Sequence, residues 1–305
     1  MKTPDLRVTV AGIALANPVL TASGTCGTGE ELARVLDLKK LGGFVTKSIS
    51  VEPRSGHPAP RLAETAAGML NCIGLQNVGV EQFIAEKMDF LRTSGTRVIV
   101  NVVGRQIVDY VACAQRLDRI PGIDFLELNL SCPNVQEGLD NGANPHWVNQ
   151  CVSAVRTIIK LPLIAKLTPN THDIVGLARA AEDGGADAVS AINTLLGTAI
   201  DIETRRPRLS NVTGGLSGPA IKPVALACVM KIARAVKIPV IGIGGICSGA
   251  DVVEFLLAGA TAVQIGTATF RRPTACLEAI SQLREYLQTH KIPRVTDIIG
   301  AAKLP

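Results

Sequence analysis

The 305-residue sequence contains very few aromatic residues, since six Phe, two Tyr and one Trp make up only 3% of it. The core must therefore be built from Ala, Val, Ile and Leu, in keeping with a hydrophobic fraction of 47%. A chain of this size and apolarity can bury roughly three quarters of its unfolded surface, which excludes a disordered protein. No stretch approaches the length of about 18 apolar residues that a membrane-spanning helix needs, so we expect no membrane partner.

The sequence also lacks closely spaced cysteines and a dense basic stripe. The nearest of the eight cysteines, such as Cys113 and Cys132, lie 19 residues apart, so we expect no metal ligand set and no iron–sulfur cluster on this chain. Scattered thiols fit a reducing, cytoplasmic location better than a secreted disulfide scaffold. The net charge is +5, and basic residues cluster only at Arg205–Arg208 and Arg271–Arg272, so we expect no nucleic-acid partner.

The chain instead contains an alternation of short apolar runs and helical patterns. Eight continuous apolar runs predict strands of a parallel sheet that is covered on both faces. Between them lie stretches with apolar residues at i, i+3, i+4 and i+7. This order predicts an α/β fold, a (β/α)8 TIM barrel forming one domain over residues 1–305, with a doubly wound sheet as the alternative. The predicted strands are Val19–Ala22, Phe44–Thr46, Arg97–Val102, Phe125–Leu128, Leu163–Ala165, Ala188–Ile192, Pro239–Ile243 and Ala262–Ile265. The predicted helices are Val80–Leu91, Ile107–Leu117, Trp147–Ile159, Ile174–Glu182, Pro223–Val236 and Ala250–Leu257.

Two connections are much longer than the usual βα loop of about two to six residues. They run from Lys47 to Gly79 and from Asn193 to Ile221, and both follow the carboxyl ends of predicted strands. Active sites of barrels are assembled on that face, so we expect these long loops to cover the site. The weak alternation of Arg7–Leu15 predicts a hairpin that closes the opposite end of the barrel.

Polar or glycine residues occur at the ends of all eight predicted strands. Side chains at the carboxyl ends of barrel strands converge on one cavity. The glycines after the seventh and eighth strands lie where barrels bind a phosphate group, because glycine lets backbone N–H groups approach an anion closely. A phosphorylated cofactor is therefore predicted. A dinucleotide loop at Gly242–Cys247 is the weaker interpretation, because its last position is Cys and it belongs to the seventh strand of the series, not the first. The strand-end residues are Ser23, Lys47, Asn101, Asn129, Lys166, Asn193, Gly244, Gly245, Gly266 and Thr267.

Lys166 and Cys132 carry the chemistry that residue type predicts. Lys166 would place a cation where negative charge accumulates in a reduced flavin, which favours flavin as the cofactor. Cys132 lies within Asn129–Asn134, just before Pro133, and is predicted to be a positioned thiol base or nucleophile. A free thiol has a pKa of about 8.5, so modest electrostatic stabilisation of the thiolate makes it a usable base. No His lies within this motif, which disfavours acyl transfer.

Several motifs together resemble those of the class 1 dihydroorotate dehydrogenases. The most specific are NLSCPN at Asn129–Asn134 and GGLSGPAIKP at Gly214–Pro223. The resemblance implies an FMN-binding barrel that oxidises dihydroorotate to orotate in de novo pyrimidine biosynthesis. GGLSGPAIKP is most similar to the NAD-linked subclass 1B, which implies a heterotetramer with an electron-transfer subunit that carries FAD and a 2Fe–2S cluster. The resemblance extends from about Leu6 to Phe270 and also includes Ala22–Thr25, Thr46–Ser48, Asn71–Asn77 and Asn193–Thr194.

The same resemblance implies roles for individual residues. Cys132 would take the C5 proton of dihydroorotate, while the C6 hydride would go to the flavin. The residues implied in substrate binding are Lys47, Asn71, Ile73, Gly74, Leu75, Asn129, Asn134, Asn193 and Thr194. Those implied in flavin binding are Ser23, Lys47, Ser48, Asn101, Asn129, Lys166, Ile192 and Gly218, together with the phosphate-binding Gly244, Gly245, Gly266 and Thr267.

Three alternative functions remain open at this point. One is the fumarate-dependent subclass 1A, and another is the flavin domain of dihydropyrimidine dehydrogenase, which uses a similar cysteine. A third is a non-redox barrel that binds a phosphorylated metabolite for an isomerase or synthase reaction. Cys26 and Cys72 depart from the family pattern, and Cys72 is a candidate second thiol near the substrate because it follows Asn71.

Overall fold

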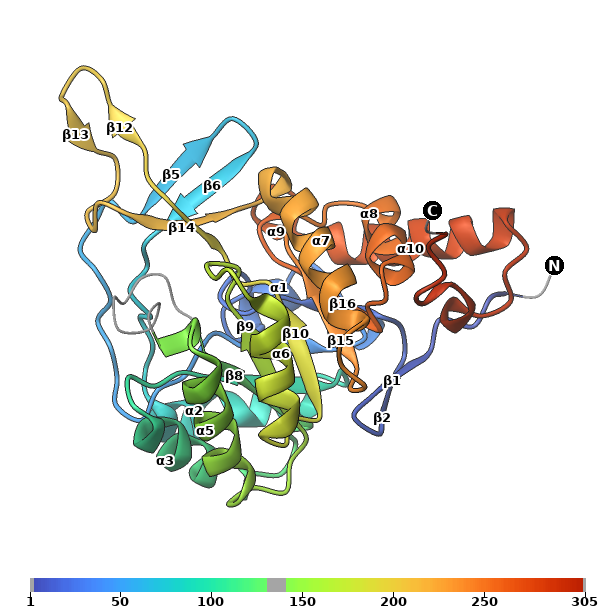
Figure 1. The fold of residues 1–305 in the computed structure, drawn as a ribbon, viewed down its shortest axis with the longest axis horizontal. Helices are drawn as coiled ribbons and strands as arrows, with labels where there is room; N and C mark the ends of the chain where they lie inside the picture. The colour runs from blue at the N-terminus through green and yellow to red at the C-terminus, as the bar shows by residue number, and fades with distance from the viewer. Residues whose placement is uncertain (1–2, 131–140, 304–305) are drawn as a thin grey trace.

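The computed structural model describes residues 3–130 and 141–303, in which eight parallel strands form one curled sheet (Figure 1). The neighbours run in the order β3, β16, β15, β10, β9, β8, β7 and β4. A parallel bridge between Leu20 and Gly43 joins the first strand to the last, and the Gly42 N–H donates to the Val19 carbonyl at 2.9 Å. The sheet thus closes as a barrel, which confirms the predicted fold class. The strands are β3 (Val19–Thr21), β4 (Phe44–Val45), β7 (Val98–Val102), β8 (Phe125–Asn129), β9 (Leu163–Leu167), β10 (Ala188–Ala191), β15 (Val240–Ile243) and β16 (Ala262–Ile265).

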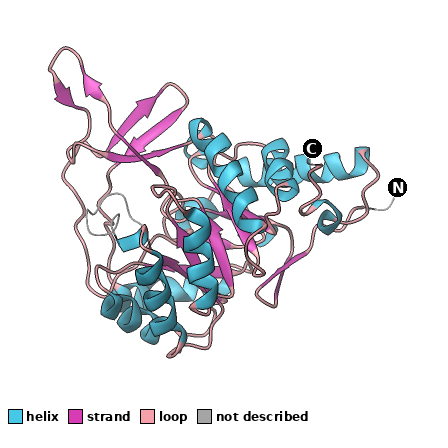
Figure 2. Cartoon of the chain, in the orientation of Figure 1, coloured by secondary structure: helices cyan, strands magenta, loops and turns pink. Residues whose placement is uncertain are grey.

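Helices cover the outer face of this barrel (Figure 2). All six predicted helices are present, with ends that differ from the prediction by at most three residues. The start of α5 shows why such ends shift, because the Asn144 side chain accepts hydrogen bonds from the N–H groups of His146 and Trp147 and Pro145 follows it. The described helices are α1 (Glu30–Ala33), α2 (Val80–Thr93), α3 (Ile107–Leu117), α5 (Pro145–Arg156), α6 (Ile174–Asp183), α7 (Lys222–Ala233), α8 (Gly249–Leu257), α9 (Ala268–Arg271) and α10 (Ala275–Thr289). None of them is long and apolar enough to cross a bilayer.

The predicted hairpin before the first barrel strand is present as β1 (Val8–Val10) and β2 (Ile13–Leu15). The two strands pair in antiparallel fashion with Val8 opposite Leu15. Val8, Val10 and Leu15 are buried, so the alternation in this segment reflects one face turned to the core.

The two long connections pair with each other, which the sequence patterns do not predict. They form a four-stranded antiparallel sheet in the order β11, β14, β6 and β5, in which Gly215 lies opposite Asn71. This sheet lies at the upper left of Figure 1, beside the smaller hairpin of β12 and β13. The strands are β5 (Leu62–Thr65), β6 (Gly68–Asn71), β11 (Leu195–Gly197), β12 (Ile200–Asp201), β13 (Arg206–Pro207) and β14 (Gly214–Ser217). We call the four-stranded sheet the cover sheet.

The predicted strand ends need one correction. Asn101, Asn129 and Lys166 lie within β7, β8 and β9 and do not follow them. Each of these strands continues through its polar residue because the side chain is accommodated in the barrel interior. Asn101, for example, is completely buried and donates a hydrogen bond to Glu127 at 2.7 Å.

Candidate active site

A cavity of about 370 Å³ lies between the carboxyl ends of the barrel strands and the cover sheet. Its size is typical of sites for small organic ligands. Most of the residues predicted from the sequence to bind substrate or cofactor line it, although they come from widely separated parts of the chain. These are Ser23, Lys47, Ser48, Asn71, Ile73, Leu75, Asn129, Lys166, Ile192, Asn193, Thr194, Gly218, Gly244, Gly245, Gly266 and Thr267.

Two predicted site residues that the structure describes, Asn101 and Gly74, do not line this cavity. Cys132 and Asn134 lie outside the described residues. Asn101 is buried inside the barrel, deeper than the cavity wall. Gly74 has a positive φ of 72°, and a Cβ atom there would lie 2.6 Å from the backbone nitrogen of His57. We infer that Gly74 shapes the turn that presents the neighbouring residues to the cavity.

Amide and hydroxyl groups form one polar wall of the cavity. The Asn129 Nδ2 atom donates to Ser48 Oγ at 3.3 Å, and the Asn193 Nδ2 atom donates to Asn129 Oδ1 at 3.1 Å. From α3, the Tyr110 hydroxyl donates to the Asn129 carbonyl at 2.7 Å. From the cover sheet, Asn71 Nδ2 donates to the Gly215 carbonyl at 3.2 Å. Amides that are fixed in this way offer both donors and acceptors to a ring that carries N–H and C=O groups.

Lys166 contributes a buried positive charge to the same cavity. Its side chain is only 6% exposed, and it lies on β9 opposite Asn129 of β8. Among the described residues it has no hydrogen-bond or ion-pair partner. A buried ammonium group is costly unless an anion or an acceptor compensates it, so the site fits a ligand that brings negative charge to this wall. This observation agrees with the sequence-based preference for a flavin.

Backbone groups at the ends of β15 and β16 form an opening suited to a phosphate group. Gly245 has a φ of +74°, and a Cβ atom there would lie 2.8 Å from the backbone nitrogen of Lys222, so only glycine fits. Over the described ranges, the N–H groups of Gly245, Gly266 and Thr267 donate no hydrogen bond within the protein. Unpaired N–H groups that face a cavity favour an anion, as predicted for the phosphate of a cofactor.

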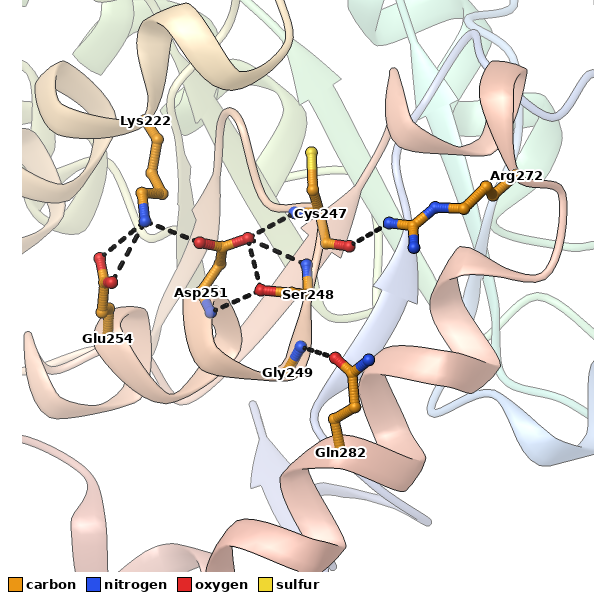
Figure 3. Close-up of polar contacts among 8 residues, drawn as sticks. All are labelled: Lys222, Cys247, Ser248, Gly249, Asp251, Glu254, Arg272 and Gln282. Atoms are coloured by element: carbon orange, nitrogen blue, oxygen red, sulfur yellow. Dashed lines mark hydrogen bonds and ion pairs between the residues drawn. The ribbon is translucent and has the colours of Figure 1, made fainter.

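A carboxylate fixes the loop that follows this glycine pair (Figure 3). Asp251 Oδ2 accepts hydrogen bonds from the backbone N–H of Cys247 at 2.8 Å and from that of Ser248 at 2.9 Å. Its other oxygen accepts from Lys222 Nζ at 2.7 Å. On the far side, Arg272 donates to the Cys247 carbonyl at 2.7 Å. The loop is therefore held from both sides before any ligand binds.

Burial by itself raises the pKa of the Asp251 carboxyl, but hydrogen bonds from Lys222, Cys247 and Ser248 outweigh it and hold the pKa below its ordinary value of 3.8. We therefore expect Asp251→Asn to lower the free energy of unfolding by about 1–3 kcal/mol at pH 7. A depressed pKa stabilises the fold above the unfolded-state pKa and ceases to do so as pH falls through the folded-state value. The difference between variant and parent in denaturant unfolding should thus shrink below about pH 4.

Glu254→Gln is the matched control for this prediction. Glu254 contacts the same Lys222 ammonium at 3.1 Å, but it is 44% exposed and bonds no loop N–H group. We expect it to cost at most about 1 kcal/mol. Equal losses in both variants would mean that the Lys222 ion pairs, and not the loop hydrogen bonds, stabilise this region.

Several cavity-lining residues had no clear signal in the sequence. Met69, Cys247 and Phe270 line the cavity, as does Ser217, which lies within a quoted motif but was given no role. Phe270 is 55% exposed although it is one of only nine aromatic residues. An aromatic residue shortly after a predicted phosphate loop could have indicated it.

The described cysteines support a structural role for most thiols. Burial raises the pKa of Cys113, Cys151 and Cys276 to about 12, so all three are protonated at neutral pH. Cys72 is completely buried against Leu70 and Leu209 and does not line the cavity. The structure thus gives no support to Cys72 as a second thiol near the substrate.

The fold and the site define this chain as a (β/α)8 barrel whose strand-end cavity is suited to a phosphorylated cofactor and a polar ring. Comparison with known proteins agrees: the family model for dihydroorotate dehydrogenase matches residues 5–287. The chain belongs to the dihydroorotate dehydrogenase family, whose members are flavin-dependent.

Curated relatives and a solved structure are consistent with this assignment. The chain is 54% identical over 299 residues, 98% of each chain, to a protein of Pelobacter propionicus named dihydroorotate dehydrogenase B (NAD(+)), catalytic subunit. It is 53% identical over 305 residues, 100% of each chain, to a protein of the same name from Geobacter metallireducens. The dihydroorotate dehydrogenase of Eimeria tenella, solved with ferulenol, shares the fold with a TM-score of 0.82 at 22% identity, covering 97% of this chain and 88% of that one.

Proposed function

We propose that this chain is the catalytic subunit of an NAD-linked dihydroorotate dehydrogenase, folded as one domain, that binds FMN and oxidises dihydroorotate to orotate for pyrimidine biosynthesis. One observation carries the proposal: a single cavity combines the buried Lys166 ammonium, the glycine opening at Gly245 and Gly266, and the amide wall. The names of full-length relatives at 53–54% identity support the same reaction and acceptor.

The proposed reaction removes one proton and one hydride from neighbouring carbons of the substrate. Cys132, as a thiolate base, takes the proton from C5, and the hydride leaves from C6 with its electron pair. FMN, when bound, supplies the two-electron acceptor for this hydride. The C5–C6 bond of dihydroorotate becomes the double bond of orotate, so protons and electrons balance.

The chain's own residues orient the substrate for this step. Asn71, Asn129 and Asn193 line the cavity and can bond the amides and carbonyls of a pyrimidine ring, with Asn134 added from the motif. Lys47 is proposed to pair with the substrate carboxylate. The cover sheet contributes Asn71 and Met69 to the cavity wall, so it also limits the access of water to the ring.

We further propose cytoplasmic heterotetramers in which a second subunit with FAD and a 2Fe–2S cluster carries electrons to NAD. The phrase "catalytic subunit" in the relatives' names supports a second subunit. The wide spacing of the cysteines supports placing the cluster on that partner. The reducing cytoplasm suits a chain whose seven described cysteines are all free.

An absorbance spectrum tests the flavin assignment directly. We expect the purified chain to be yellow, or to become yellow with added FMN, and we expect anaerobic dihydroorotate to bleach it. Bleaching requires both the cofactor and the substrate to bind in one productive arrangement. A correctly folded protein that stays colourless with added FMN would contradict the proposal and would favour the phosphate-binding isomerase or synthase alternative.

A further inference from the structure

One buried carboxylate in the barrel has no part in the reaction described above. Glu127 lies on β8, two residues before Asn129, and is completely buried. Alternate residues of a strand point to the same side, so Glu127 lies on the same side as Asn129 but about 7 Å further from the cavity. It therefore occupies the layer of side chains directly beneath the cavity floor.

Three side chains donate hydrogen bonds to this carboxylate. Asn101 Nδ2 of β7 donates to Oε1 at 2.7 Å. Gln264 Nε2 of β16 and Ser190 Oγ of β10 donate to Oε2 at 2.7 Å and 2.9 Å. Every partner is a donor, which matches an ionised carboxylate, since that form only accepts hydrogen bonds. The barrel thus holds a negative charge with hydrogen bonds from three different strands.

The carbonyl ends of the Asn101 and Gln264 side-chain amides accept no hydrogen bond from the described residues in this arrangement. Asn101 Oδ1 and Gln264 Oε1 are buried and have no partner in the part of the chain that the structure describes. A buried acceptor without a partner is unfavourable, so only a strong interaction at the NH₂ end explains both orientations. Glu127 therefore determines which way the Asn101 amide points.

The neighbouring strand carries the opposite charge one layer higher. Lys166 lies opposite both Asn129 and Ser190 in the sheet register, so it adjoins the Glu127 network. Nevertheless, the Lys166 ammonium and the Glu127 carboxylate form no ion pair with each other. The cation faces the cavity, while hydrogen bonds from neutral side chains satisfy the anion below it.

We propose that Glu127 is a positioning residue that maintains a negative charge beneath the flavin and opposes Lys166 in setting the flavin's reduction potential. The inference rests on the proposed function, since it requires a flavin in the cavity. Reduction adds negative charge to the flavin ring, so a fixed anion nearby disfavours the reduced form. At an effective dielectric constant of about 20, two unit charges about 10 Å apart change an equilibrium constant by at least tenfold.

Glu127→Gln tests this role because it removes the charge and keeps the shape. The new amide can donate to Asn101 Oδ1 once the Asn101 amide turns, so the barrel retains a hydrogen bond there. We expect the flavin-loaded variant to favour reduced flavin at least tenfold more than the parent does. This corresponds to a two-electron midpoint potential higher by at least about 30 mV, measured by anaerobic equilibration with a reference dye. Lys166→Met should shift the potential in the opposite direction.

Ser190→Ala is the matched control, because it removes one hydrogen bond to the same carboxylate and keeps the charge. We expect it to move the potential far less than Glu127→Gln does. Glu127→Met, of similar length and also uncharged, should reproduce the upward shift and serves if the first variant folds poorly. An unchanged potential in flavin-loaded Glu127→Gln, or an equal shift in Ser190→Ala, would overturn the inference. A parent protein that takes up no flavin would instead contradict the proposed function.

Discussion

Cys132→Ser is expected to retain flavin and substrate and to reduce turnover near pH 7 by at least about 100-fold, the lower range of what general-base catalysis contributes. The reason is the acidity of the group at this position. An ordinary thiol has a pKa of about 8.5 and is partly ionised close to neutral pH, whereas a serine hydroxyl is not. Activity should return in part at high pH. Anaerobic stopped-flow measurement of flavin reduction by dihydroorotate across pH 6 to 10 checks both expectations.

Cys72→Ser provides the comparison for this variant. Cys72 is completely buried outside the cavity, and its Sγ atom lies 3.7 Å from both the Pro60 carbonyl and Ser210 Oγ. A hydroxyl can make the same contacts, so we expect nearly the parent rate of flavin reduction. Full activity of Cys132→Ser at pH 7, together with an inactive Cys72→Ser, would show that Cys132 is not the catalytic base.

The barrel was predictable because each of its strands is a local feature of the sequence. Runs such as Val98–Val102 are apolar except at Asn101, and their flanking helices carry a clear helical period. The cover sheet was not predictable in the same way. Its strands are three or four residues long, and β14 begins with two glycines, so their pairing depends on the contact between Asn71 and Gly215. That contact joins segments far apart in the chain.

The site shows the same division between local and long-range information. Lys47 and Asn193 could be predicted because parallel barrel strands all end on one face. Glu127 could not, since the run that contains it was interpreted as one more apolar strand. Its partners Asn101, Ser190 and Gln264 come from three other strands, and nothing in the sequence indicates that they meet. The charged residue inside an otherwise apolar strand was the available signal.

The electron acceptor provides the other large effect that we expect. The flavin-loaded chain alone should be reduced by dihydroorotate and should pass electrons to artificial dyes, yet reduce NAD poorly. Its Gly242–Cys247 stretch begins within the seventh barrel strand, and Gly244 and Gly245 line the cavity, so it is not a separate dinucleotide loop. Addition of the electron-transfer subunit with FAD and a 2Fe–2S cluster should raise NAD reduction into the usual enzymatic range of about 1–1,000 per second.

The same assay with Cys132→Ser shows whether the electrons that reduce NAD come from dihydroorotate. In that variant the partner subunit should restore almost no NAD reduction at pH 7. The reason is that the substitution impairs oxidation of dihydroorotate, which precedes electron transfer to the partner. Rapid NAD reduction by the isolated parent chain would contradict a separate electron-transfer subunit. Efficient fumarate reduction by the isolated chain would place it in subclass 1A, because fumarate would then accept electrons directly from the flavin in this cavity.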